Sequence, residues 1–181
     1  MKLLQILVLF SPKIPEIYNI NKIYICNNKY TLEHIFPKAY MNKKSFNDIH
    51  NIYICNNMIN NMRSNYKFTD FNYHNKTIQD DFKRILNTNN YISNKHKLFI
   101  PENESKGIIA RSIMYISHEY KYKYNKIIDT NVLIEWCLNN PPSKEEIYHN
   151  HVASIKQFKR NKFIDLYHKK NYKCFILNQF K

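Results

Sequence analysis

Glycine is nearly absent from this chain of 181 residues, with Gly107 as its one example. Clusters of proline and asparagine must therefore supply the turns between structured segments. No apolar run approaches the roughly 20 residues that a membrane-spanning helix needs. A hydrophobic content of 44%, with 15% aromatics, is too high for a disordered tail. The length suits one domain with a sizeable core.

Closely spaced cysteine pairs are also missing. The sequence contains no C-x-x-C motif, which argues against a zinc knuckle and against a thioredoxin-type redox site. Two disulfides would be compatible with export, and buried free thiols with retention inside a cell. The four cysteines are Cys26, Cys55, Cys137 and Cys174.

Acidic residues are scarce. The chain has 14 Asp or Glu against 28 Lys or Arg, which gives a formal net charge of +14. Such a surplus attracts polyanions, so nucleic acid is the first candidate partner and an anionic membrane surface the second. A codon bias without any partner is the third explanation, because Asn, Ile, Lys and Tyr, which all have A/T-rich codons, make up about half of the chain. The charge alone favours nucleic acid.

Residues 1–20 are interpreted as a short signal peptide or an N-terminal extension. Met1 and Lys2 precede an apolar stretch, but no small-x-small cleavage site follows before Pro12. With a signal peptide the protein would be secreted, and otherwise it would be intracellular. We expect the folded domain to span 21–181 and to be a monomer.

The first half of the domain is predicted to contain short strands. Runs of β-branched and aromatic residues predict strands over 23–26, 32–36 and 49–54. Residues 56–65 predict a short helix with Met58, Ile59 and Met62 facing inward. The Asn-rich residues 86–97 predict a loop.

The second half is predicted to be helical. Isoleucines at three-to-four-residue spacing predict a helix over 108–120, directly after the glycine. Residues 131–139 predict a second helix, which ends before two prolines. Ser143 and Glu146 have the S-x-x-E form of a capping box, which would begin a third helix reaching about Phe158. The predicted fold class is α+β.

One stretch, 31–68, contains the residue types that phosphodiester hydrolysis needs. The reaction needs a cation near the scissile phosphate and a base that takes a proton from the attacking water. The oxygens of Glu33 and Asn60 suit Mg²⁺, which takes few protein ligands and keeps several waters. His34, near its ordinary pKa, suits the base. Glu33 and His34 are adjacent in a predicted strand, so they reach one site only if the strand twists or ends there.

The same stretch resembles the endonuclease I family of ββα-metal (His-Me finger) nucleases. The family motifs E-H-x-x-P, D-x-H-N and E-V-N-x-D-R-S/G-N correspond here to Glu33-His34…Pro37, Asp48…His50-Asn51 and Asn60…Arg63-Ser64-Asn65. The segment KGIIARSIMYISHEY at 106–120 is similar to a later family motif. The resemblance covers about 23–165 in one order.

The resemblance implies a single α+β domain with a ββα-metal core and a helical C-terminal half. It implies an Mg²⁺-dependent, largely sequence-nonspecific endonuclease that cleaves DNA, and in some members RNA, to leave 5′-phosphate ends. Glu33 and Asn60 would hold one Mg²⁺, with Mn²⁺ or Ca²⁺ as alternative occupants. His34 would be the general base, and Arg63 would belong to the catalytic site either as a supporting residue or as a contact to phosphate.

The resemblance also implies a supporting role for three residues on the second predicted strand. Asp48, His50 and Asn51 would be structural, with Asn51 steadying the segment that follows His34. Without the resemblance, Asp48 and Asn51 are equally well explained as turn residues and His50 as a structural histidine.

The segment between Pro37 and Asp48 departs from the family because it contains no arginine. Bacterial periplasmic members use an arginine there to hold the cleaved phosphate. Lys38, Lys43 and Lys44 are the candidate replacements, although an ammonium group lacks the bidentate geometry of a guanidinium. Lys67 is a further candidate for binding nucleic acid.

The missing arginine leaves an alternative open, namely a nucleic-acid-binding protein that retains the fold with weak or no turnover. The intact Glu33, His34 and Asn60 favour the enzyme. A sequence-specific HNH nuclease would need a further DNA-reading module, and a membrane-surface protein would need a basic amphipathic helix, which is not evident.

Overall fold

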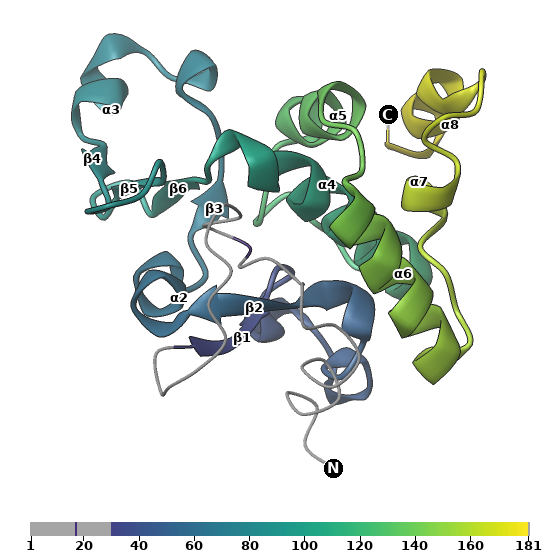
Figure 1. Cartoon of the computed structure of the whole chain (residues 1–181). Helices are drawn as coiled ribbons and strands as arrows, with labels where there is room; N and C mark the ends of the chain where they lie inside the picture. The colour runs from purple at the N-terminus through teal and green to yellow at the C-terminus, as the bar shows by residue number, and fades with distance from the viewer. Residues whose placement is uncertain (1–16, 18–29, 181) are drawn as a thin grey trace.

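A small ββα unit forms one end of the molecule. The structure is a computed structural model, and it describes residue 17 and residues 30–180. Strand β1 (Tyr30–His34) pairs antiparallel with β2 (Ile52–Asn56), and helix α2 (Asn57–Arg63) follows β2 directly (Figure 1). The predicted ββα arrangement is therefore confirmed. The strand predicted over 23–26 lies outside the described residues.

Short 3-10 helices connect β1 to β2. They are η1 (Lys38–Tyr40), η2 (Lys43–Ser45) and η3 (Ile49–Asn51). The predicted strand over 49–54 is wrong in its first part, because the Asp48 carboxylate accepts a hydrogen bond from the His50 backbone N–H at 3.0 Å and so starts η3 instead. The predicted strand over 32–36 likewise ends earlier, at His34.

Helix α2 presents a narrower inner face than was predicted. Ile59 is 2% exposed, but Met58 is 53% and Met62 36% exposed, so the inward placement of both methionines is wrong. The inner position four residues after Ile59 is occupied by Arg63, which is 1% exposed. In a helix this short only one i, i+4 row faces the core.

A second sheet follows the ββα unit in the chain and precedes the helices of the C-terminal half. Its strands run in the order β3-β6-β5-β4, with β3 parallel to β6 and the other pairs antiparallel. The elements of this region are β3 (Lys67–Phe68), η4 (Phe71–Tyr73), α3 (Lys76–Asp80), β4 (Lys83–Arg84), β5 (Tyr91–Ser93) and β6 (Leu98–Ile100). The loop predicted over 86–97 is wrong at β5, where Ile92 and Ser93 are buried.

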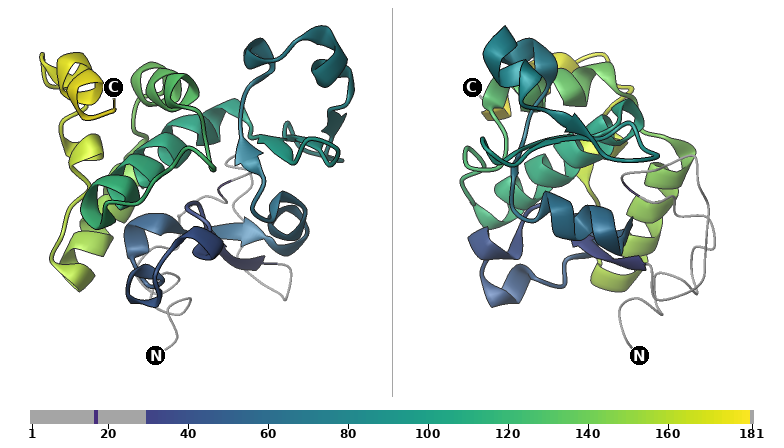
Figure 2. Two further views of the ribbon diagram at one scale, coloured as in Figure 1. Left: turned by 180° about the vertical axis from the view of Figure 1, so that it is seen from behind. Right: turned by 90° about the vertical axis from the view of Figure 1, so that its left-hand side faces the viewer.

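The C-terminal half is helical, as predicted. Helix α4 crosses the molecule and is buried along most of its length, while the other helices pack around it (Figure 2). The helices are α4 (Asn103–Tyr120), α5 (Thr130–Asn139), α6 (Lys144–Gln157), α7 (Lys162–Asp165) and α8 (Tyr172–Phe180). No helix in the described part of the chain is long and apolar enough to cross a membrane. Cys55, Cys137 and Cys174 are free thiols, and Cys26 lies outside the described residues.

Gly107 lies inside α4 rather than before it, and the packing there requires a glycine. A Cβ atom at this position would lie 2.6 Å from the carbonyl oxygen of Asn140 and 2.6 Å from Nη2 of Arg111. The missing side chain therefore lets the end of α5 approach α4 closely.

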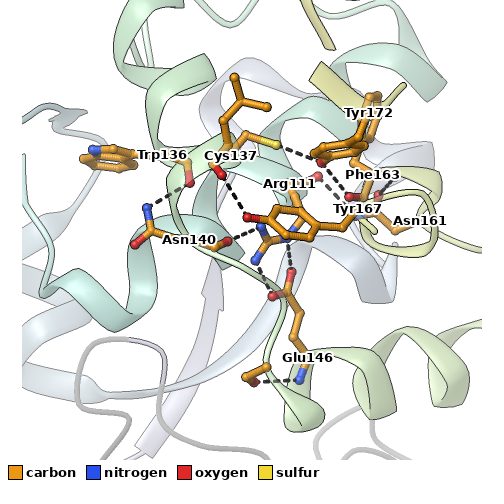
Figure 3. A network of polar contacts seen from close by, with 11 residues as sticks. Arg111, Trp136, Cys137, Asn140, Glu146, Asn161, Phe163, Tyr167 and Tyr172 are labelled. Carbon is orange, nitrogen blue, oxygen red and sulfur yellow. Dashed lines mark hydrogen bonds and ion pairs between the residues drawn. The ribbon is translucent and has the colours of Figure 1, made fainter. Parts of the chain in front are cut away.

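A buried ion pair joins α4 to α6 at the same place. Arg111 donates to both carboxylate oxygens of Glu146, from Nε at 2.8 Å and from Nη2 at 2.5 Å, and its Nη1 donates to the Asn140 carbonyl at 2.6 Å (Figure 3). Ser143 caps α6 by accepting from the Glu146 backbone N–H. Only the Ser143 half of the predicted capping box is thus formed. The Glu146 side chain, which would complete it, is paired with Arg111 instead.

Glu146→Gln should lower the free energy of unfolding by about 3–5 kcal/mol, because it leaves the buried Arg111 guanidinium without its counter-charge. Chemical denaturation measures the change. Glu145→Gln is the matched control, since Glu145 is exposed in the same helical turn and its loss should cost at most about 1 kcal/mol. Equal effects of the two substitutions would contradict the importance of the pair.

Two buried histidines hold α6 against the ββα unit. His149 stacks on Tyr53 with ring centroids 4.6 Å apart, and its Nε2 donates to the Ile49 carbonyl at 2.9 Å. Burial lowers the pKa of His149 to about 4. Burial also lowers the pKa of His50, whose Nε2 lies 3.0 Å from the Lys159 carbonyl.

Acid should therefore destabilise the fold through His149. The unfolded chain takes up a proton near pH 6.5 and the folded chain only near pH 4, so the free energy of unfolding should fall as the pH drops across this window. One such group contributes up to about 1.4 kcal/mol per pH unit. Denaturation at several pH values measures the slope. His149→Gln should flatten it and the exposed His151→Gln should not, and identical slopes in both variants would refute the assignment.

Candidate active site

A pocket of about 450 Å³ lies between the end of β1 and helix α2. Glu33, His34, Asn60 and Arg63 all line it, so the residues that the sequence analysis singled out come together in space. Because β1 ends at His34, two adjacent residues reach one pocket instead of opposite faces of a strand. Its full lining is Leu32, Glu33, His34, Pro37, Lys38, Ala39, Asn60, Asn61, Arg63, Ser64 and Asn65.

The His34 ring is fixed by a backbone carbonyl. Its Nε2 donates to the Phe46 carbonyl at 2.8 Å, which leaves Nδ1 as the nitrogen that can accept a proton. Burial lowers the pKa of His34, and the positive charges of Lys38 and Arg63 act in the same direction against the backbone carbonyls. The imidazole is therefore neutral at pH 7, as a general base must be.

Arg63 is buried beneath the pocket and connects α2 to the end of β1. Its Nη1 lies 3.1 Å from Oε1 of Glu33 and 3.0 Å from the Ser64 carbonyl, and its Nη2 donates to the Ile35 carbonyl at 2.7 Å. The guanidinium also stacks over the Phe68 ring, 4.4 Å from its centroid. These contacts make Arg63 a positioning residue for Glu33 and for the end of β1.

Glu33 and Asn60, the two predicted cation ligands, both line the pocket. Asn60 Nδ2 donates to the Leu32 carbonyl at 3.3 Å, which orients the amide and assigns Oδ1 as its acceptor. No group of three or more His, Cys, Asp or Glu side chains that could hold a metal occurs among residues 30–180. A carboxylate with an amide oxygen fits a hard cation that keeps several of its waters, and so fits Mg²⁺ better than zinc.

The three supporting residues are buried in η3 and at its start. Asn51 binds the backbone of Phe36 in both directions, accepting from its N–H at 2.6 Å and donating to its carbonyl at 3.0 Å. Asp48 accepts from Tyr120 Oη at 2.7 Å and from Gln157 Nε2 at 2.9 Å. Asn51 therefore fixes the chain that follows His34, and Asp48 ties η3 to α4 and α6.

The candidate nucleic-acid-binding lysines separate in the structure. Lys38 is exposed and lines the pocket, with its Nζ 5.6 Å from the centroid of the Phe46 ring. Lys43 and Lys44 are exposed on η2, outside the pocket lining. Lys67 lies on β3, where its Nζ pairs with Asp129 at 2.6 Å, so the structure does not bring it to the pocket.

Sequence reasoning did not identify Phe46 or Asn61. Phe46 contributes a backbone carbonyl, which leaves no signal in the residue type. Asn61 lines the pocket beside Asn60, but asparagine is so frequent in this chain that its position alone carried no information.

Comparison with known families decides the class of protein. The family described as Endonuclease I matches residues 18–167. The chain belongs to the endonuclease I family. None of the curated proteins compared with it matches. This member of the endonuclease I family is a nuclease, a hydrolase whose substrate is nucleic acid.

Arg63→Lys should lower the free energy of unfolding by about 2–4 kcal/mol, because one ammonium group cannot serve Glu33 and several carbonyls at once. Thermal or chemical denaturation gives the value. Arg84→Lys is the control, since Arg84 makes its hydrogen bonds at an exposed position. If Arg63→Lys were no more destabilising than Arg84→Lys, the guanidinium would not organise the site.

Proposed function

We propose that this pocket hydrolyses the phosphodiester bonds of DNA with one bound Mg²⁺, with little sequence preference and with 5′-phosphate products. RNA is a second candidate substrate of the same chemistry. The observation that carries the proposal is the convergence of a neutral histidine, a carboxylate and an amide oxygen in one pocket. We further propose that the nuclease domain spans 21–181 and acts as a monomer.

His34 is the general base of the proposed reaction. The Phe46 carbonyl holds the proton on Nε2, so Nδ1 accepts the proton of the attacking water. Asn51 keeps this geometry by fixing the backbone two residues beyond His34. The histidine therefore needs no carboxylate partner to select its tautomer.

Glu33 and Asn60 are the proposed ligands of the cation. A bound Mg²⁺ supplies positive charge next to the scissile phosphate and the leaving oxygen. Arg63 holds Glu33 through Oε1, and the Leu32 carbonyl orients Asn60, so both ligands are fixed before a cation arrives.

Lys38 is the proposed phosphate-binding cation of the pocket. It is exposed, whereas Arg63 is buried and its Nη atoms are engaged with Glu33 and backbone carbonyls. Lys38 therefore stands in for the arginine that the 37–48 segment lacks, as a flexible point charge rather than a planar fork.

Purified protein should nick supercoiled plasmid in Mg²⁺ and should not do so in EDTA. His34→Ala should lower the rate by at least about 100-fold while DNA affinity stays within a few-fold of wild type, because only the base is lost. Agarose-gel densitometry gives the rates and fluorescence anisotropy gives the affinity.

His151→Ala is the matched control, because His151 is exposed on α6 and outside the pocket lining. Glu33→Gln should abolish nicking at ordinary Mg²⁺ concentrations. If His34→Ala nicked as fast as His151→Ala, the assigned base would be wrong. If wild type bound DNA but nicked none in Mg²⁺, the binding-only alternative would replace the proposal.

A further inference from the structure

Two lysine-rich segments that are far apart in sequence lie together beside the pocket. The first runs from Lys38 to Lys44 through η1 and η2, and the second is the connection 121–126 between α4 and α5. Together they carry six exposed lysines, here called the lysine track: Lys38, Lys43, Lys44, Lys121, Lys123 and Lys126. Lys38 also lines the pocket, so the track begins at the pocket itself.

Tyrosine side chains fasten the two segments to each other. Tyr122 Oη accepts from the Asn42 backbone N–H at 3.0 Å and lies 2.9 Å from Ser45 Oγ, and the ring packs on Phe36 with centroids 5.7 Å apart. Lys126 Nζ lies 5.9 Å from the centroid of the Tyr40 ring. The track is therefore a fixed surface whose formation costs little ordering entropy when a ligand binds.

The lysine track has no acidic residue within either segment. The nearest carboxylates in sequence are already engaged: Asp129 pairs with Lys67, Glu119 with Lys159, and the buried Asp48 accepts from Tyr120 and Gln157. No track lysine forms an ion pair with any of residues 30–180. Several basic side chains elsewhere are paired with acidic neighbours, namely in Lys76–Asp80, Lys95–Asp81, Lys106–Asp70, Arg111–Glu146 and Arg160–Asp165.

We infer that the lysine track binds the sugar-phosphate backbone of DNA next to the scissile bond, with the 121–126 segment forming its outer part. The inference rests on the proposed function, because it places the flanking phosphates relative to the pocket. An uncompensated row of ammonium groups releases counterions from DNA and gives affinity without reading the base sequence. Family membership does not assign this role to the 121–126 connection.

Replacement of the outer lysines tests the inference. The variant Lys121→Gln/Lys123→Gln/Lys126→Gln is made in the His34→Ala background, so that binding is measured on intact duplex DNA. We expect affinity at 0.15 M salt to fall on the order of 10- to 100-fold, and the slope of log K against log salt to become shallower by about 2–3. Fluorescence anisotropy over a salt series measures both quantities.

Lys169→Gln/Lys170→Gln/Lys173→Gln is the matched control, in the same background. These lysines are equally exposed, and their replacement removes the same net charge. They lie just before α8 and in its first turn, at the end of the helix opposite to Phe180, which is the α8 residue that contacts Tyr124 of the 121–126 segment. Figure 1 places α8 at the opposite end of the helical half from β1 and α2. The control should keep the wild-type slope. Equal effects of the two triple variants would show that total charge rather than the track drives binding and would overturn the inference.

The two proposals fail separately. In the His34-containing protein, the 121–126 triple variant should raise KM at least about 10-fold and leave kcat within about 2-fold of wild type, because the pocket is untouched. Unchanged KM with normal cleavage would refute the track and leave the nuclease assignment standing. If the triple variant had the expected shallower salt slope but wild type cleaved no DNA, the track would be supported and the DNA-hydrolase proposal refuted.

Discussion

The site depends on one buried guanidinium. Arg63 reaches from the last turn of α2 to the end of β1, where it binds Glu33 and the carbonyls of neighbouring residues. A charge with 1% of its surface exposed is tolerated only when it is paired and hydrogen-bonded, and Glu33 supplies the counter-charge. The carboxylate proposed to hold a cation therefore also balances the charge inside the ββα unit. Removal of either partner would disturb both the core and the pocket.

A second buried pair performs the corresponding task in the helical half. Arg111 and Glu146 join α4 to α6, and Asn161 Nδ2 donates to the Arg111 backbone carbonyl at 3.1 Å (Figure 3). From there α6 extends to the ββα unit, where His149 stacks on Tyr53 and Gln157 binds both Asp48 and the Ile49 N–H. The C-terminal helices thus pack against η3 and hold it in place. Through Asn51, η3 in turn fixes the chain next to His34.

The sequence was most informative for features that depend on the type of a side chain and on its spacing along the chain. The spacing of Glu33, His34 and Asn60 predicted a shared site, and the structure places all three in one pocket. The helices of the second half followed from their periodicity, whereas their ends depended on tertiary contacts. Gly107 was expected directly before a helix. It lies inside α4 instead, where close packing against Asn140 leaves no room for a Cβ atom, even though glycine lowers helix stability.

The remaining features of the site depend on backbone atoms and on long-range contacts, which residue types do not encode. The Phe46 carbonyl orients His34. The resemblance implied that Asn51 steadies the segment after His34, but Asn51 was predicted in a strand, whereas it lies in η3 and binds the Phe36 backbone from there. Met58 and Met62 were expected in the core, but Arg63 occupies that face because its ion pair with Glu33 requires it. Similarly, no local pattern relates Tyr122 to Asn42, which it contacts across 80 residues.

The distribution of basic groups indicates different roles for arginine and lysine in this nuclease. Arg63 beside the pocket and Arg111 at the α4–α6 junction are both buried, and each binds its partners through several donors at fixed positions. The lysine track, by contrast, consists of exposed lysines. A guanidinium suits rigid internal pairing, and an ammonium on a flexible stem suits a ligand that must bind in many sequence contexts and then leave. Geometric accuracy at the scissile bond would therefore come from Glu33, His34 and Asn60, and affinity from charges that impose little geometry. Under the proposed function, this arrangement favours cleavage wherever the backbone can enter the pocket.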